Sequence, residues 1–241
     1  MKKSVTEKKT VGRKGVAVSG GGGRMGRLLV AVLHEHPVFT LSLLLPRANQ
    51  IERVTNQDTR DVELVVDFSV PENTLAVASM CVERGIPLFV GTTGFTPTQL
   101  KNLENTINGK IPWAMVPNTS LGVFLMKKTI QMWAPYLGVD YQVYLEEAHH
   151  IHKKDHPSGT AKMLAAEAIE NGLKLSDTLV MRGGSEVGDH RLIALGTGER
   201  LELQHRAVDR SLFASGALRL AQKLIKQKPR RKSYQIDELF E

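Results

Sequence analysis

The chain has a single cysteine, Cys81, among its 241 residues. One thiol cannot form an intrachain disulfide, and Cys81 lies in the apolar stretch "LAVASMCVERGI", which predicts a buried side chain rather than a reactive thiolate. Long apolar runs are also missing, since none approaches the ~18 residues of a membrane span. The lysine-rich opening has no apolar signal core behind it. We therefore expect a globular cytoplasmic protein with no membrane partner.

Aromatic residues are scarce as well, at 5% of the chain, although the formal net charge is +7. Much of the positive excess lies at the two ends, in Lys2, Lys3, Lys8, Lys9, Arg13 and Lys14 and in Lys223, Lys226, Lys228, Arg230, Arg231 and Lys232. Basic ends with few aromatic side chains to stack on bases are weak support for nucleic-acid binding. We expect no nucleic-acid partner and interpret the basic ends as solvated surface or as an attraction for anionic small molecules.

The segment "GVAVSGGGGRMGRLLVAVLHEH", from residue 15, is typical of a strand, a glycine-rich turn and a helix. Gly20, Gly23 and Gly26 have the spacing G-x-x-G-x-x-G, and Gly22 adds a G-x-G. A phosphate-binding turn needs glycine where the backbone bends sharply beside the free N–H groups of a helix N-terminus. Alone the motif is weak, because glycine-rich turns after strands also arise for steric reasons.

Strands and helices alternate in the segments that follow. We predict strands over 38–45, 62–69 and 86–93, and helices over 71–85 and 96–108. Such alternation indicates an α/β fold, a Rossmann-like doubly wound parallel sheet that binds its ligand beyond the carboxyl ends of its strands. The polar segments "DFSVPE", "GTTGF" and "VPNTS" follow apolar runs at these positions, and they favour a nucleotide cofactor.

The pattern changes after Ser120. Helices are predicted over 121–137 and 159–173, with strands over 139–150, 178–184, 190–198 and 200–208. These segments predict a second α+β domain built on an open mixed or antiparallel sheet. A last helix, over 211–225, is expected to return to the nucleotide domain.

The stretch "EEAHHIHKKDHPSGTA", residues 146–161, is the densest group of ionisable side chains in the sequence. A metal site is the first interpretation, because histidine and aspartate are zinc ligands. The spacing argues against it: a strand over 143–152 would place His150 and His152 on one side and His149 on the other. No helical H-x-x-x-H and no cysteine pair is present, so we expect no metal.

Proton transfer to an anionic substrate is the second interpretation. Lys153 and Lys154 are adjacent cations, and Ser158-Gly159-Thr160 opens a helix whose first N–H groups can bind a carboxylate. A neighbouring histidine can donate a proton near neutral pH. A solvated loop before a capped helix is the third interpretation, and composition alone leaves it open.

Seven motifs taken together resemble the dihydrodipicolinate reductase family. They occur in the order and rough spacing of that family: "GGGGRMGR", "DFSVPE", "GTTGFT", "PNTSLGV", "EEAHHIHKKDHPSGTA", "RGGSEVGDH" and "GERLELQHRA". The similarity runs from about residue 15 to about residue 225. It implies an NAD(P)H-dependent reductase that converts 4-hydroxy-tetrahydrodipicolinate to tetrahydrodipicolinate in lysine and diaminopimelate biosynthesis.

The resemblance also implies roles for individual residues. His149 matches the proton donor of the family, and Lys153 matches the lysine that assists protonation and holds a substrate carboxylate. The expected substrate-binding residues are His150, Ser158, Gly159 and Thr160, together with Arg182 for the second carboxylate. The expected cofactor-binding residues are Gly20, Gly21, Gly22, Gly23, Arg24, Met25, Gly91, Thr92, Thr93, Val116, Pro117, Asn118 and Thr119.

The family fold implies a nucleotide-binding domain made of both chain ends and a homotetramer joined through the central sheets. We accordingly expect a dinucleotide-binding domain from 1–119 and 211–241, and a substrate-binding and oligomerisation domain from 120–210. The substrate partner would be a small dicarboxylate.

Two features depart from the family pattern. At the end of the second strand, where an acidic residue usually binds the adenosine ribose, this chain has Pro46 and Arg47. Because arginine accommodates the 2′-phosphate of NADP, we predict NADPH as the preferred cofactor and NADH as the weaker one. The segments 46–61 and 173–182 are also shorter than in many relatives, which affects loops that commonly shape lids and subunit contacts.

The sequence has features that argue against two rival functions. An aspartate-semialdehyde dehydrogenase shares the nucleotide fold but needs a cysteine nucleophile, and Cys81 lies in a predicted helix rather than at a strand end. A nucleotide-sensing regulator without catalysis would use the basic ends on nucleic acid. It would have no use for the histidine, lysine and "PSGTA" group.

Overall fold

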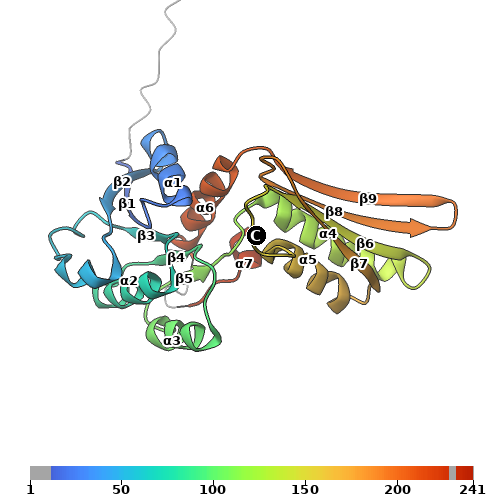
Figure 1. Cartoon of the computed structure of the whole chain (residues 1–241). Helices are drawn as coiled ribbons and strands as arrows, with labels where there is room; N and C mark the ends of the chain where they lie inside the picture. Colours follow the sequence, from blue (N-terminus) through green and yellow to red (C-terminus); the bar gives the residue numbers. More distant parts are fainter. Residues whose placement is uncertain (1–11, 228–231, 241) are drawn as a thin grey trace, which may run out of the picture. The chain divides into compact units, whose positions relative to one another are not determined.

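The computed structural model describes residues 12–227 and 232–240 (Figure 1). The chain divides into two compact units, one of Met1–Pro117 with Ala217–Glu241 and one of Asn118–Gly216. The boundaries expected from sequence, 1–119 with 211–241 for the dinucleotide-binding domain and 120–210 for the substrate-binding domain, stay a prediction. Among the basic end residues, those outside the described ranges are Lys2, Lys3, Lys8, Lys9, Lys228, Arg230 and Arg231. Within the described ranges, no helix combines the length and the apolar character needed to cross a membrane.

A five-stranded parallel sheet forms the centre of the first unit. Its strands are β1 (Lys14–Ser19), β2 (Phe39–Leu44), β3 (Leu64–Asp67), β4 (Leu88–Val90) and β5 (Trp113–Met115), in the order β2-β1-β3-β4-β5. The inner strands consist almost entirely of buried residues, as expected where helices cover both faces of a sheet. The prediction of a doubly wound parallel sheet is confirmed.

Local sequence explains where the helices of this unit begin and end. They are α1 (Arg24–His34), the 3₁₀ helix η1 (Ala48–Arg53), α2 (Pro71–Arg84), α3 (Pro97–Ile107), α6 (Ser211–Leu224), which crosses the boundary of the units, and α7 (Ile236–Phe240). Thr96 and Gln99 form a capping box at the start of α3, and Gly85 ends α2 in the left-handed conformation. Cys81 is fully buried on α2, as predicted, and burial raises the pKa of its thiol.

The second unit contains a four-stranded mixed sheet. Its strands are β6 (Gln142–His149), β7 (Leu175–Arg182), β8 (Gly188–Gly196) and β9 (Glu199–Ala207), in the order β7-β6-β8-β9. β6 and β7 are parallel because α5 (Gly159–Glu170) connects them, whereas β6–β8 and β8–β9 are antiparallel. Of the two alternatives predicted for this sheet, mixed or antiparallel, the structure has the mixed one.

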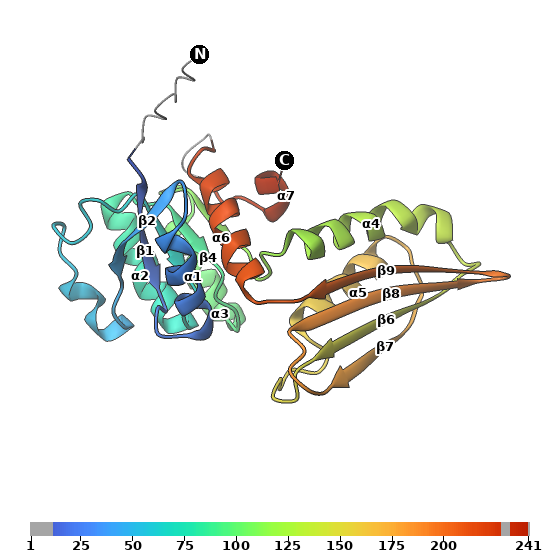
Figure 2. The same ribbon diagram turned by 90° about the horizontal axis from the view of Figure 1, so that it is seen from above.

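One face of this sheet is covered by two helices, α4 (Leu121–Leu137) and α5 (Figure 2). Along β6 burial alternates, so that Val143, Leu145, Glu147 and His149 face the helices. The core between the sheet and the helices includes Ile130 on α4 and Leu164 on α5. Because a strand alternates its side chains, the first two of these β6 residues are apolar and the last two form a polar end of the same buried face.

The strand predicted over 139–150 is shorter in the structure, and its continuation to residue 152, which the argument about a metal site used, is wrong. β6 ends at His149, and residues 151–152 form a turn. The backbone N–H of His150 donates to Glu186 O at 2.8 Å, and the N–H of Lys153 donates to His150 O at 3.0 Å. These hydrogen bonds replace the sheet ladder, so His152 lies in a turn outside the strand, although its ring centroid is still 6.3 Å from that of His150.

Candidate active site

The glycine-rich turn joins β1 to α1 at the carboxyl edge of the parallel sheet. Gly20 has φ +81°, and a Cβ there would lie 2.2 Å from Phe68 O. A Cβ at Gly26 would lie 2.1 Å from Gly20 O, so α1 packs against the turn more closely than any other residue type allows. The side chain of Arg27 donates to Gly22 O at 3.1 Å. The turn therefore has the tight backbone and the adjoining helix N-terminus that a pyrophosphate needs.

A buried carboxylate organises the same edge of the sheet. Asp67 ends β3 in register with Ser19 and Val90, and it is fully buried. It accepts hydrogen bonds from the hydroxyls of Ser69, Thr74 and Thr92. The segments "DFSVPE" and "GTT" are thus held together by one side chain, that of Asp67, which was not predicted as a site residue.

The predicted cofactor residues of "GTT" differ in their surroundings. Gly91 is buried against the ring of Phe68, where a Cβ would lie 2.1 Å from the Phe68 Cζ. The hydroxyl of Thr92 is used by Asp67 and by the N–H of Ser69, at 2.7 and 2.8 Å. Thr93 is exposed. The side chain of Thr92 therefore supports the loop, and Thr93 presents its side chain to solvent.

Two other predicted cofactor segments lie at strand ends. Arg47 is exposed and follows β2, whose Leu44 would contact a Cβ at Gly21 at 2.8 Å. The end of β2 is therefore next to the glycine turn. The segment Val116 to Thr119 is divided between the units: Val116 N donates to Val90 O at 2.8 Å, whereas the Asn118 amide donates to Thr160 Oγ1 at 2.9 Å.

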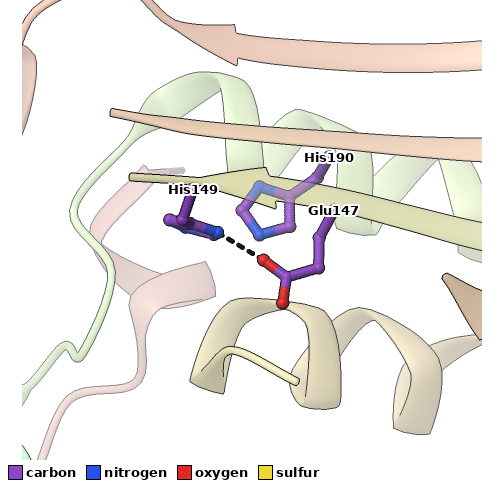
Figure 3. A group of neighbouring side chains, drawn as sticks. All are labelled: Glu147, His149 and His190. Carbon is purple, nitrogen blue, oxygen red and sulfur yellow. Dashed lines mark hydrogen bonds and ion pairs between the residues drawn. The ribbon is translucent and has the colours of Figure 1, made fainter. Parts of the chain in front are cut away.

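The polar end of β6 forms the centre of a second cluster, in the second unit. The carboxylate of Glu147 accepts a hydrogen bond at Oε2 from Nδ1 of His149, and at Oε1 from the backbone N–H of Ser158 (3.0 Å) and from Nη2 of Arg182 (2.7 Å). The side chain of Glu147 is completely buried. Figure 3 shows Glu147 and His149 beside each other, with the ring of His190 next to both.

His190 extends the cluster across the sheet. It is paired with Glu147 in the β6–β8 register and with His205 in the β8–β9 register. Its Nε2 lies 3.3 Å from Ser158 Oγ, and its ring stands edge-on to His149 with centroids 5.2 Å apart. Neither Glu147 nor His190 was predicted from the sequence as a site residue. The alternation of buried and less buried side chains along β6 could have indicated Glu147, because Glu147 and His149 occupy the same alternate positions as the apolar residues.

Burial and charge determine the ionisation of these side chains. Burial lowers the pKa of His149, and the Glu147 carboxylate opposes that effect. Burial alone would raise the pKa of Glu147, but hydrogen bonds from Arg182 and Ser158 and the nearby His149 bring its pKa below the usual value. Burial, with His149 beside it, lowers the pKa of His190 to about 4. Near neutral pH the cluster therefore combines an anionic Glu147 with a neutral His190.

The remaining predicted substrate residues lie in the loop after β6 and at the start of α5. Lys153 is half-buried and forms an ion pair with Asp155 at 2.8 Å. Ser158 caps α5 by accepting from Ala161 N at 3.1 Å, and Gly159 N donates to Asp155 Oδ2 at 3.3 Å. His152 and His156 are exposed, as expected. The structure thus gives the N–H groups of Ser158 and Gly159 protein partners, where free donors for a carboxylate had been expected.

Arg182 is also occupied by protein groups. Besides Glu147, its Nη2 donates to Asp155 O at 2.6 Å and its Nη1 donates to Met181 O at 2.7 Å. In this arrangement the guanidinium holds the loop after β6 against β7 and neutralises part of the charge of Glu147.

Among the described residues, one group has donor atoms placed where they could hold a metal ion. The donors of Glu147, His149 and His190 lie within 4.8 Å of one another. Both oxygens of Glu147 already accept hydrogen bonds, however, and the guanidinium of Arg182 would repel a cation. The absence of a metal stays a prediction.

Comparisons with known proteins agree over nearly the whole chain. Models of the family "Dihydrodipicolinate reductase", N-terminus and C-terminus, match residues 14–119 and 122–240. The 4-hydroxy-tetrahydrodipicolinate reductase of Magnetococcus marinus is 36% identical, in an alignment that covers 89% of this chain and 94% of the relative. That of Nitrosospira multiformis is 36% identical, in an alignment that covers 86% of this chain and 90% of the relative.

A solved structure is similar in fold. The dipicolinate-bound dihydrodipicolinate reductase from Paenisporosarcina sp. TG-14 covers 94% of this chain and 99% of its own, with a TM-score of 0.76 and 19% sequence identity. The likeness supports the two-part α/β architecture.

Proposed function

The chain belongs to the dihydrodipicolinate reductase family, and on that premise we propose which of its residues carry out the family reaction. The reaction is the NAD(P)H-dependent reduction of 4-hydroxy-tetrahydrodipicolinate in lysine biosynthesis. The observation that carries the assignment of residues is the buried pair of Glu147 and His149 beside Lys153. In the described part of the chain, nothing favours the nucleotide-sensing regulator.

We propose that the nicotinamide cofactor is held by the turn from Gly20 to Met25. Gly20 and Gly26 fit this role, since a Cβ at either position would meet backbone atoms at 2.1–2.2 Å and distort the turn. Gly91 to Thr93 and Val116 to Thr119 complete the proposed set. The cofactor, when bound, supplies a hydride to the substrate. The residues of the chain bind it and orient it.

Preference for NADPH rests on Arg47. Its exposed side chain follows β2 near the glycine turn, and no acidic residue stands at that strand end to repel a 2′-phosphate. We expect Arg47→Ala to lower kcat/KM with NADPH by about tenfold, as for the loss of one charge-assisted contact, and to leave NADH nearly unchanged. If kcat/KM of the wild type is equal for NADPH and NADH and the substitution leaves it unchanged, Arg47 does not bind the 2′-phosphate.

His149 is the proposed proton donor and Lys153 the proposed partner of a substrate carboxylate. The protonated imidazole gives up a proton at Nε2, while Glu147 accepts at Nδ1 and stabilises the positive ring. Lys153 attracts the anionic substrate and stabilises negative charge as it develops. Because the donor must be protonated, kcat/KM is expected to fall as pH rises through the pKa of His149.

The substrate carboxylates are assigned to the start of α5. We propose contacts with Ser158, Gly159, Thr160 and His150, and we include Arg182 through its hold on Glu147. Thr160 lies beside the Asn118 amide. Since the N–H groups of Ser158 and Gly159 have protein partners, we infer that the Thr160 hydroxyl and the Lys153 ammonium are the main contacts in this conformation.

Oxidation of NADPH and NADH at 340 nm with freshly prepared 4-hydroxy-tetrahydrodipicolinate tests the assignment. We expect His149→Gln to lower kcat by about 10² or more, and Lys153→Ala to lower kcat/KM chiefly through a higher KM for the substrate. His152→Gln is the matched control, because His152 is exposed in the turn after β6. A His149→Gln enzyme with the turnover of the wild type would remove His149 from the mechanism.

We also propose a homotetramer and a location in the cytoplasm. The helix-free face of the β7-β6-β8-β9 sheet supports the tetramer, because it exposes Leu179 and Met181 to solvent. On the same face Glu146 and Arg191 form an ion pair. Analytical ultracentrifugation would give the mass, and a monomer at micromolar concentration would exclude the tetramer.

A further inference from the structure

In the hydrogen bond between Glu147 and His149, the other contacts of Glu147 determine which side chain is the donor. Both oxygens of the carboxylate act as acceptors: Oε2 faces Nδ1 of His149, and Oε1 faces two donors that cannot change, the N–H of Ser158 and the Nη2 of Arg182. A carboxylate at this position therefore requires Nδ1 of His149 to carry a hydrogen. In the neutral ring that leaves Nε2 as the free, basic nitrogen.

We propose that Glu147 is the positioning residue of this enzyme, fixing the Nδ1–H tautomer and the orientation of His149 so that Nε2 exchanges the proton of the reaction. The inference deepens the proposed function and rests on it for the role of His149. Glu147 acts through His149 and does not touch the substrate.

The surroundings of Nε2 support this assignment. A Cβ at Gly188 would lie 3.0 Å from His149 Nε2, so glycine at this position of β8 keeps the space beside Nε2 free. Glu147 itself is inaccessible to a substrate, since its side chain is fully buried. The two ring nitrogens thus have different environments, one against a buried anion and one beside the backbone of Gly188, where no side chain intervenes.

The other charged and titratable groups around His149 come from every neighbouring element. Arg182 on β7 and Lys153 in the loop after β6 disfavour a positive ring, and Asp155 partly neutralises Lys153. His190 on β8 is neutral near pH 7, and His205 on β9 lies beyond it. Among these neighbours Glu147 is the one that raises the pKa of His149, so its removal would disfavour the acid form of the donor.

An isosteric substitution makes the tautomer testable. In Glu147→Gln only one oxygen remains, and the two fixed donors on the Oε1 side will attract it. The amide NH₂ then faces Nδ1 of His149, which must become an acceptor. We therefore expect the neutral ring to change to the Nε2–H tautomer, and its acid form to lose the anion that stabilised it.

The matched control is Glu146→Gln, one residue earlier on the same strand. Glu146 points to the opposite face of β6 and pairs with Arg191, so its substitution also removes one carboxylate from the sheet. It leaves the contacts of His149 intact. Any effect of lost charge alone should appear in both variants.

The first measurement is ¹⁵N NMR of histidine-labelled full-length protein, with His149→Gln used to assign the His149 signals. We expect Nδ1–H in the wild type and in Glu146→Gln, and Nε2–H in Glu147→Gln. The second is the pH profile of kcat and kcat/KM. In Glu147→Gln the descending limb should move to lower pH, with kcat reduced by about 10² and KM for the substrate little changed.

Two results would overturn the proposal: an Nε2–H tautomer in the wild type, or a folded Glu147→Gln protein whose tautomer and pH profile match those of the wild type. The wild-type spectrum decides the matter if Glu147→Gln fails to fold. Should the tautomers behave as expected while His149→Gln keeps full activity, the positioning by Glu147 would stand and the proposed role of His149 would fail.

Discussion

Substitution of Gly26 by alanine tests how tightly the cofactor turn is built. The new Cβ would lie 2.1 Å from Gly20 O and 2.6 Å from both Gly20 C and Gly21 Cα. These are backbone atoms, so no side chain can rotate away and α1 must move. Overpacking of this kind costs about 1–3 kcal/mol, and the backbone clash places it near the upper end. Alanine regains about 1 kcal/mol of helix propensity, which leaves a net loss of roughly 2 kcal/mol.

Thermal unfolding and cofactor titration measure the two consequences. A loss of roughly 2 kcal/mol corresponds to a fall in Tm of about 4–8 °C for a chain of this size. A displaced turn should also raise the Kd for NADPH by about tenfold, which a fluorescence titration would measure. Gly22→Ala is the control for stability, because a Cβ there has nothing within 4 Å. A Gly26→Ala protein that melts like the wild type and binds NADPH equally well would refute the reasoning.

Two further predictions concern the second unit. Leu164→Ala should lower the free energy of unfolding by about 2–5 kcal/mol in urea, because Leu164 is fully buried, whereas Ile169→Ala on the exposed side of α5 should cost less than about 0.5 kcal/mol; equal losses would contradict the packing. The pKa of His190 is about 4 in the folded protein and near 6.5 when unfolded, so the unfolded state binds more protons between these values. Stability should therefore fall by up to about 3 kcal/mol as pH is lowered through that window, and His190→Gln should flatten the curve.

Much of the fold of the first unit could be predicted from sequence, because the patterns that indicate it lie within short segments. The alternation of apolar strands with helices gave the parallel sheet, and the glycine spacing located the turn that Gly20 and Gly26 require. The hydrogen bonds that converge on Asp67 could not be predicted from the sequence. Ser69 and Thr74 are close to Asp67 in sequence, but Thr92 is 25 residues away and reaches this carboxylate only after β3 and β4 pair. A single aspartate after a strand does not indicate which hydroxyls it will bind.

The second site was only partly predictable. The motif around residues 146–161 indicated a group of ionisable residues, and the resemblance to a family selected His149 and Lys153 from it and implied their roles. The mixed sheet depended on the parallel pairing of β6 with β7, and the end of β6 at His149 is marked by the hydrogen bond from His150 N to Glu186 O; the local pattern of "HHIH" reveals neither.

The sequence by itself determined the two kinds of architecture and the glycine turn, since these depend on the pattern and spacing along one segment. It also located the group of ionisable residues over 146–161, but without the family resemblance it did not rank His149 against His150. Tertiary structure alone decided that Glu147 accepts from His149, Ser158 and Arg182 at once, and that His190 lies across from it. The reason is physical. A carboxylate stays ionised when buried only if donors converge on it, and these donors come from three elements brought together by the pairing of β6 with β7 and by the packing of α5.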